Sequence, residues 1–346
     1  MRSDNNSGIS PEILQAIIDE NNGDAEAYGR DDLTARSEAV LQSAFECEDL
    51  KAFNLISGTA ANSLIIATLS PTFGAVFCHQ DSHVNGDECG ANEFQSGGAK
   101  LVPLKGRDGK ITGSELEEAI DWFTIGEPHH SQPSMLSIAQ STEAGTVYSP
   151  DEIHDLSTVL KKHNLKLHMD GARFANAVAK IGCSPAEMTW KAGVDALSFG
   201  STKNGTLGAE AAIFFNGCDD GSFIYRRMRS GHLLSKMRFV SAQIIAYLEN
   251  DLWLKNATHA NLMAEKLYQG VKNSDHIKFS FPVQSNVMFA EIEDQLREKL
   301  STSGFQFYSK KNGDISTSRL VTAFNTSPEL MDEFIEIVRA LNNKPL

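Results

Sequence analysis

Short apolar runs that alternate with segments of helical periodicity constrain the fold of this chain more than any other feature. The segment 151–163 has apolar residues at helical spacing, with Asn164 as a stop signal, and is the clearest of the helices between the runs. This alternation predicts an α/β fold in which helices cover a mostly parallel sheet. The predicted strands are Ala75–Cys78, Leu101–Leu104, Met135–Ala139, Leu165–Met169, Ala196–Phe199 and Ala211–Phe215.

The length of the chain predicts two domains of unequal size. Its 346 residues exceed what one ordinary hydrophobic core occupies. A first helix should begin at Ser10-Pro11, because serine is a preferred N-cap and proline suits the first helical position. We assign residues 1–25 to an N-terminal arm with this helix, 26–240 to the large domain, and 241–346 to a small α+β C-terminal domain.

The C-terminal part has a different hydrophobic pattern from the rest of the chain. A long helical stretch from Ser241 to about Val271 should be broken near Asn256. Apolar runs at 287–290 and 320–324 then predict strands, and the periodicity of residues 328–341 predicts a closing helix.

Charge and composition exclude several classes of protein. A formal net charge of −14 would repel a phosphate backbone, so we expect no nucleic-acid partner. With 41% hydrophobic and 22% charged residues, no apolar run of bilayer length and no leader pattern at Met1, the sequence indicates a cytoplasmic protein without a membrane partner. The five cysteines are odd in number and lack C-x-x-C spacing, which argues against disulfides or structural zinc and for reduced packing residues.

An acid after one predicted strand and a lysine after a later one point to pyridoxal phosphate (PLP). Asp170 follows the run Leu165–Met169, and Lys203 follows Ala196–Phe199. A carboxylate can pair with the pyridinium nitrogen and keep the ring electron-poor, while a lysine can bind the cofactor covalently as a Schiff base. We therefore predict that Asp170 and Lys203 hold PLP.

A glycine-containing turn could bind the phosphate of such a cofactor. Ser57-Gly58-Thr59 follows an apolar run and opens a helical segment that contains Asn62. The free amides at a helix N-terminus, aided by a threonine hydroxyl, suit a phosphate dianion. Because the chain has neither G-x-G-x-x-G nor G-x-x-x-x-G-K-[ST], binding of a dinucleotide or a nucleoside triphosphate is not expected.

Histidine and arginine residues add further candidates. His83 could stack on a flat heteroaromatic ring or act as an acid or base near neutral pH. His79 lies four residues before it, but the chain has no H-E-x-x-H pattern and no identifiable third ligand, so we predict no metal site. Arg173 and Arg319 are candidates for binding a carboxylate, which matches the planar fork of a guanidinium.

From Arg2 to about Arg339 the sequence resembles the low-specificity L-threonine aldolases, which are fold type I PLP enzymes of the β-eliminating lyase group. The most specific match is His168–Arg173, which is similar to the family's H-x-D-G-A-R. The other matching segments are Arg2-Ser3-Asp4, Tyr28-Gly29, Ser57-Gly58-Thr59 with Asn62, His83 with Glu88 and Gly90, Lys203 with Leu207-Gly208-Ala209, and Arg319–Thr322.

The resemblance implies roles for these residues, a PLP cofactor, and a homodimer or a homotetramer built as a dimer of dimers, with sites at the dimer interface. The homotetramer is the form that we predict. The implied catalytic residues are Lys203, His83, Glu88 and Asp170. The implied cofactor-binding residues are Gly58, Thr59, Asn62, His83, Asp170, Arg173, Thr202 and Lys203. The implied substrate-binding residues are Ser3, Tyr28, Arg173 and Arg319.

Three segments depart from the family pattern. Gln140–Ala144 replaces E-N-T-H-N, so the histidine that approaches the substrate hydroxyl is absent. Gly231–Lys236 replaces a glycine-rich segment, and Ala323 replaces the histidine of V-T-H. These changes concern the preference for a substrate side chain, and their combination is similar to the branch that includes phenylserine aldolases.

The implied reaction is PLP-dependent cleavage of L-threonine, L-allo-threonine and related β-hydroxy-α-amino acids to glycine and an aldehyde. His83, Glu88 or an ordered water are the candidates for the base that takes the β-hydroxyl proton. The alternatives are a phenylserine aldolase, another PLP reaction such as β-elimination or transamination, or a non-catalytic PLP-binding module. The intact Lys203 argues against the last of these.

Overall fold

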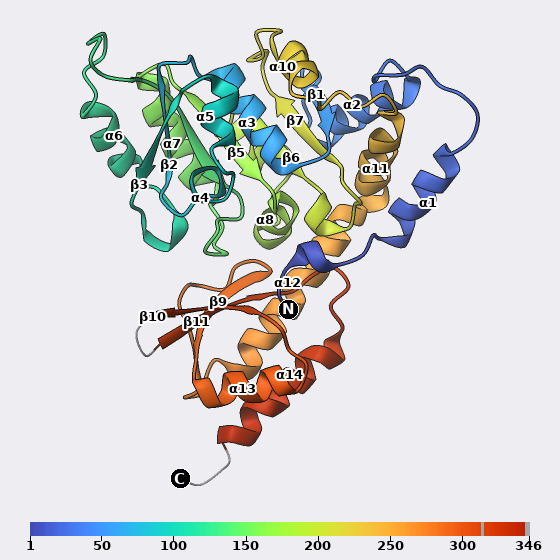
Figure 1. Cartoon of the computed structure of the whole chain (residues 1–346), viewed down its shortest axis with the longest axis vertical. Coiled ribbons are helices and arrows are strands. Elements are labelled where there is room, and N and C mark those ends of the chain that lie inside the picture. Colours follow the sequence, from blue (N-terminus) through green and yellow to red (C-terminus); the bar gives the residue numbers. More distant parts are fainter. Residues whose placement is uncertain (313–314, 343–346) are drawn as a thin grey trace.

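The computed structural model describes residues 1–312 and 315–342 and contains two separate sheets (Figure 1). The large sheet has seven strands in the order β1-β7-β6-β5-β4-β2-β3. Strands β3, β2, β4, β5 and β6 run parallel to one another, whereas β7 is antiparallel to both of its neighbours. The strands are β1 (Lys51–Leu55), β2 (Gly74–His79), β3 (Lys100–Leu104), β4 (Gln132–Ala139), β5 (Lys166–Gly171), β6 (Ala196–Gly200) and β7 (Glu210–Phe214).

Helices cover both faces of the large sheet, which explains why its strands read as continuous apolar runs. Successive residues of β6 and β7 point to opposite faces: Leu197 and Ile213 join the largest core cluster, whereas Ala196 and Ala212 join a second cluster. The helices of this part are α1 (Pro11–Glu20), α2 (Asp32–Ala44), α3 (Gly58–Leu69), α4 (His83–Gly86), α5 (Ala91–Ser96), α6 (Gly113–Asp121), α7 (Pro150–Lys162), α8 (Phe174–Ile181), α9 (Pro185–Met188), α10 (Phe223–Arg229) and α11 (Arg238–Leu248). The 3-10 helices are η1 (Asp4–Asn6), η2 (Arg107–Gly109), η3 (Trp190–Ala192), η4 (Thr202–Asn204) and η5 (Glu249–Asp251). The predicted α/β fold with a mostly parallel sheet is confirmed.

Local signals set the bounds of α7, which begins and ends one residue before the predicted helix 151–163. The Ser149 side chain accepts a hydrogen bond from the Glu152 amide, and the Glu152 side chain accepts one from the Ser149 amide, which forms a capping box. Pro150 occupies the first turn. Asn164, just beyond the helix, has φ of 56°, a left-handed conformation that asparagine tolerates.

The second sheet is antiparallel and has its own apolar core. Its order is β10-β11-β9-β8, and in Figure 1 it lies below the large sheet, with the N-terminus of the chain between the two. Its elements are α12 (Leu252–Val271), β8 (Ile277–Phe279), β9 (Val287–Ile292), α13 (Asp294–Thr302), β10 (Tyr308–Asn312), β11 (Ile315–Val321) and α14 (Pro328–Asn342). β9 covers the predicted run 287–290 and α14 covers the predicted closing helix, whereas β11 ends at Val321 and includes only the first two residues of the predicted run 320–324.

The predicted break near Asn256 is wrong, because the chain turns at η5 instead. Asn250 and Asp251 have φ of 53° and 55°, which ends α11 and starts α12 in a new direction. Asn256 lies inside α12, where its amide donates to Ser10 Oγ and to the carbonyl of Asn204. Its hydrogen-bonding capacity is used in tertiary contacts rather than in ending a helix.

The two cores meet along α12. Ala257 belongs to the core of the large sheet, and Met263 belongs to the core of the second sheet. The division of the chain at residues 25 and 240 stays a prediction.

All five cysteines are free thiols. Cys89 is exposed, so the prediction that every cysteine is a packing residue is wrong there. Within residues 1–312 and 315–342, no helix combines the length and the apolar character that a membrane span requires.

Candidate active site

Polar side chains converge where the parallel strands of the large sheet end. Asp170 lies near the end of β5, Lys203 lies in η4 directly after β6, and His83 begins α4 after β2. Because the carboxyl ends of parallel strands share one edge of a sheet, ligands of α/β proteins bind at this edge. The alternation of strands and helices thus brings together residues that the sequence separates widely.

Asn62, on α3, joins the two buried acids of the cluster. Its Nδ2 donates to Asp170 Oδ2 at 2.8 Å and to Glu88 Oε1 at 2.9 Å. The other oxygen of Asp170 accepts the amide of Ala172 at 3.0 Å. His83 Nδ1 lies 2.9 Å from the same Glu88 oxygen. The structure therefore brings four predicted site residues into one hydrogen-bonded group.

This arrangement keeps His83 charged more readily than a free histidine. The hydrogen bond to Glu88 raises the pKa of His83 although burial opposes the shift, and the negative charge of Asp170 adds to it. His83, Glu88 and Asp170 also bring metal-ligand atoms within 4.8 Å of one another. However, the Asn62 amide points its N–H donors at both carboxylates, and such donors disfavour a cation at this point.

Lys203 lies close to Asp4, His83 and Glu210, because its charge acts on the pKa of each of them. Its positive charge lowers the pKa of Asp4 and opposes the rise that burial causes in the pKa of Glu210. The neighbouring Thr202 has a buried hydroxyl beside the Glu210 carboxylate, and its backbone amide donates to Glu210 Oε1 at 3.3 Å.

The predicted phosphate turn forms the start of α3. Ser57 is the N-cap, and its Oγ accepts the amide of Ala60 at 3.3 Å. Gly58 begins the helix, and a Cβ added there would meet nothing within 4 Å, so the space beside the first amides is open. An open helix N-terminus suits a phosphate dianion. Together with Thr202, Lys203 and Asp170, these residues fit PLP.

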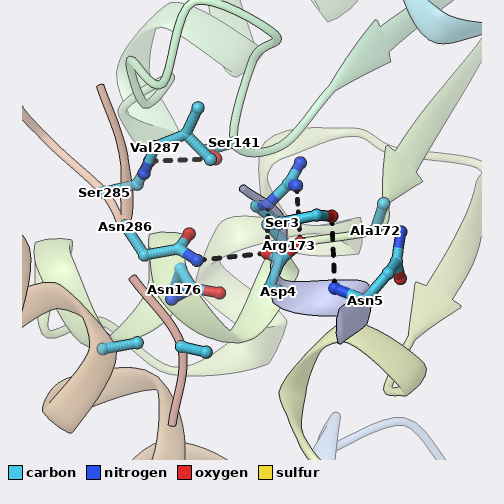
Figure 2. Close-up of polar contacts among 12 residues, drawn as sticks. Ser3, Asp4, Asn5, Ser141, Ala172, Arg173, Asn176, Ser285, Asn286 and Val287 are labelled. Atoms are coloured by element: carbon cyan, nitrogen blue, oxygen red, sulfur yellow. Dashed lines mark hydrogen bonds and ion pairs between the residues drawn. The ribbon is translucent and has the colours of Figure 1, made fainter. Parts of the chain in front are cut away.

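Arg173 is already paired with an acid of the same chain (Figure 2). Its Nε donates to Asp4 Oδ2 at 2.7 Å and its Nη2 donates to Asp4 Oδ1 at 3.0 Å. Asn286, which directly precedes β9, donates from Nδ2 to Asp4 Oδ2 at 3.1 Å and to the carbonyl of Thr322. Asp4 thus connects the N-terminal η1 with the large sheet and with the second sheet.

Sequence reasoning missed Asp4, although it stands in the matched Arg2-Ser3-Asp4 segment. It is 2% exposed, and burial favours its neutral form, but the charge and hydrogen bonds of Arg173 outweigh burial and lower the pKa of Asp4. Ser3 instead caps η1 by accepting the amide of Asn5 at 3.2 Å.

The remaining predicted substrate residues differ in their position. Arg319, on β11, lies near Arg173 and over the ring of Tyr308 at 5.9 Å. Its Nε is buried and has no hydrogen-bond partner among the described residues, and burial followed by the charge of Arg173 lowers its pKa. Tyr28 is 52% exposed, and its amide donates to the carbonyl of Ser235, outside the polar cluster. Arg319 is therefore the better placed cation for an incoming carboxylate.

His168, in the most specific motif, holds neighbouring strands together. Its Nδ1 lies 2.9 Å from Ser137 Oγ on β4, and its Nε2 lies 3.0 Å from Ser198 Oγ on β6. The side chain is fully buried, and burial lowers the pKa of His168 to about 4 while the charge of Asp170 opposes the shift.

We expect this histidine to make folding dependent on pH. His168 binds a proton near pH 6.5 in the unfolded chain but only near pH 4 in the folded chain. Its contribution to the free energy of unfolding is therefore fully present above pH 6.5 and is lost as the pH falls from 6.5 to 4. The loss should amount to about 3 kcal/mol. Urea unfolding of wild type and His168→Gln across this range measures it, and an equal pH slope in both proteins would contradict the assignment.

A second expected result concerns the buried pair of Asp4 and Arg173. Asp4→Asn should lower the free energy of unfolding by roughly 3–5 kcal/mol, because it leaves a buried guanidinium without its counter-charge. Ser3→Ala, at the adjacent position, should cost about 1 kcal/mol or less, since it removes only a cap. In a double-mutant cycle with Arg173→Gln the two changes should not be additive. Additive effects would show that the pair contributes no coupling.

Comparisons with known proteins agree with this geometry. The family model of the beta-eliminating lyases matches residues 1–294. A low specificity L-threonine aldolase of a Pseudomonas species is 41% identical over 341 residues, which cover 98% of this chain and 96% of that protein. The chain belongs to this family of aldolases.

Other members and solved structures support the same placement in the low-specificity L-threonine aldolase family. The Pseudomonas aeruginosa member is 44% identical over 308 residues, with 88% of each chain covered. The threonine aldolase of Leishmania major superposes with a TM-score of 0.92 at 26% identity and covers 98% of both chains. Serine palmitoyltransferase of Sphingomonas wittichii, at 16% identity and a TM-score of 0.72, shares the fold alone.

These findings confirm the predicted family, the fold type I architecture and the PLP cofactor. They also confirm the prediction of a carbon–carbon lyase at the level of the family. The comparisons give no support to a phenylserine aldolase or to another lyase reaction in its place. The roles of the individual site residues stay proposals.

Proposed function

We propose that this protein cleaves L-threonine, L-allo-threonine and related β-hydroxy-α-amino acids to glycine and an aldehyde. The observation that carries the proposal is the meeting of Asp170, Lys203 and His83 at one edge of the sheet in a member of the low-specificity L-threonine aldolases. Each of these residue types has a definite use in PLP chemistry.

When bound, PLP takes up the electron pair of the Cα–Cβ bond that breaks. Lys203 would bind the cofactor covalently, and Asp170 would hold a proton on the pyridinium nitrogen. The first amides of α3, with Gly58, Thr59 and the hydroxyl of Thr202, would bind the phosphate. Asn62 keeps Asp170 in place through its hydrogen bond, and the His83 ring would stack on the cofactor.

The substrate carboxylate should bind on the Arg319 side of the site. Arg319 has an unpartnered, buried Nε, and a carboxylate would supply both the missing hydrogen bond and the missing charge. Arg173 uses Nε and Nη2 on Asp4, so it supports the site mainly through its charge and its remaining N–H groups. Ser3 lies beside this pair on η1. A fixed carboxylate requires the L configuration, because only then does the Cα–Cβ bond align for cleavage.

Glycine release from L-threonine, L-allo-threonine, both L-phenylserine isomers and D-threonine tests the proposal. We expect glycine release from the L-amino acids of both Cβ configurations. Pyruvate and ammonia from L-serine, without glycine from L-threonine, would instead identify a β-eliminating reaction. Comparable rates for D- and L-threonine would contradict binding of the carboxylate by Arg319.

We also propose a homotetramer built as a dimer of dimers, with each site at a dimer interface. Apolar side chains next to the site motifs are exposed in the single chain: Ile56 is 40% and Leu207 is 62% exposed. Tyr28, at 52%, is a third aromatic or apolar group that a second copy would cover and bring to the site. Light scattering after size-exclusion chromatography tests this assembly, and a monomeric active protein would contradict it.

A further inference from the structure

Glu143 lies in the segment between β4 and α7, at the same edge of the large sheet as Asp170 and His83. Its Oε1 accepts a hydrogen bond of 2.7 Å from the backbone amide of His83. No side chain of the described residues forms an ion pair or hydrogen bond with its carboxylate. The residue as a whole keeps a partly exposed surface in the single chain.

The other candidate bases of the cluster are engaged. Glu88 has a fully buried side chain, which accepts hydrogen bonds from Asn62, Asn92 and His83. His83 has a raised pKa because of its bond to Glu88, which makes its ring a poorer proton acceptor at neutral pH. Glu143 therefore combines a partly exposed position with a carboxylate that forms no ion pair among the described residues.

The charges around Glu143 come from several elements. Burial, followed by the negative charge of Asp170, raises the pKa of Glu143 to about 7, whereas the hydrogen bond from the His83 amide opposes the shift. A carboxyl with such a pKa can both accept and return a proton under neutral conditions. The ionisable groups that interact with it are Asp170 on β5, His83 on α4, Arg173 at the start of α8, Cys78 on β2 and Tyr148 in its own segment.

We propose that Glu143 is the catalytic base that takes the proton of the substrate β-hydroxyl. The proposal rests on the aldol cleavage proposed above. It assigns this step to a residue that interacts with both His83 and Arg173, since Glu143 accepts the His83 amide and its charge acts on Arg173.

The step balances without a further reactant. The hydroxyl proton moves to the Glu143 carboxylate, and the O–H electron pair becomes the second bond of the aldehyde carbonyl. The Cα–Cβ bond breaks, and its electron pair remains with the Cα side, where a proton completes glycine. Glu143 returns its proton to solvent or to the product before the next turnover.

Glu143→Gln tests the assignment, because the amide oxygen can still accept the His83 N–H but cannot take a proton. We expect kcat for L-threonine to fall by roughly 10²–10⁴-fold, the usual contribution of a general base. Exchange of the α-proton of glycine, which has no β-hydroxyl, should not fall with it. The control is Glu93→Gln on α5, a half-buried acid outside the cluster, which should cleave L-threonine as the wild type does.

Two further readouts separate a chemical role from a structural one. Infrared titration of the cofactor-free protein should show a carboxyl that titrates near neutral pH in the wild type and in Glu93→Gln, but not in Glu143→Gln. Glu143→His should regain part of kcat, because imidazole also exchanges protons near neutral pH, and should shift the acid limb of the pH profile.

Equal cleavage by Glu143→Gln and wild type would overturn the assignment, as would a parallel fall in glycine α-proton exchange. A wild type that exchanges the glycine α-proton but cleaves no β-hydroxy amino acid would overturn the proposed function itself. This outcome differs from active cleavage in both proteins, which would overturn only the role of Glu143.

Discussion

Replacing Lys203 with alanine is expected to abolish glycine release from L-threonine, with a loss of kcat on the order of 10⁴-fold or more. The expected loss is large because the lysine binds the cofactor covalently and the residues around it cannot do so. The charge of Lys203 influences the pKa of Asp4, His83 and Glu210, and none of these three residues carries an amine.

Lys166→Ala provides a matched control for this variant. Lys166 lies at the start of β5 and forms an ion pair of 3.0 Å with Asp195, at the opposite edge of the sheet. The control should keep its activity. Borohydride reduction of the PLP-loaded protein, followed by peptide mapping, should place the pyridoxyl group on Lys203. A label on another lysine would show that the site is assigned incorrectly.

Asp170→Asn should keep the fold and lose about 10²-fold or more in kcat, which corresponds to roughly 2.7 kcal/mol of transition-state stabilisation. An amide cannot keep the pyridinium nitrogen protonated, so the electron pair of the broken bond would be taken up less well. The asparagine Oδ1 can still accept the Ala172 amide, and this preserves the local backbone.

The control for this variant is Asp195→Asn. Asp195 also accepts a backbone amide, from Leu167 at 2.8 Å, but it lies away from the cluster. The measurements are kcat for L-threonine and the free energy of unfolding of each variant. Near-wild-type kcat in Asp170→Asn would exclude the proposed role of Asp170. If kcat and the free energy of unfolding both fell in both variants, the effect would be structural.

Local patterns in the sequence were sufficient for the architecture of the large sheet. The predicted runs became β2 to β7, and β2, β6 and β7 are buried at every position, which requires apolar or small residues in succession. The first strand, Lys51–Leu55, was not predicted, because its lysine and asparagine interrupt the apolar run. The helix break at Asn250 and Asp251 was not predicted either. These residues adopt a left-handed conformation, for which the sequence gives no strong signal other than the residue types themselves.

The sequence by itself determined the fold class, the family and the residue types that PLP requires, because motifs such as His168–Arg173 are local and each chemical role demands a particular side chain. Only the tertiary structure decided which of these residues work together. Asp4 and Arg173 are 169 positions apart, and Asn62 and Asp170 are 108 positions apart. Hydrogen bonds and pKa shifts of this kind depend on distance in space, which the packing of the helices and the two sheets sets. For the same reason, the closeness of Glu143 to His83 became visible only in the folded chain.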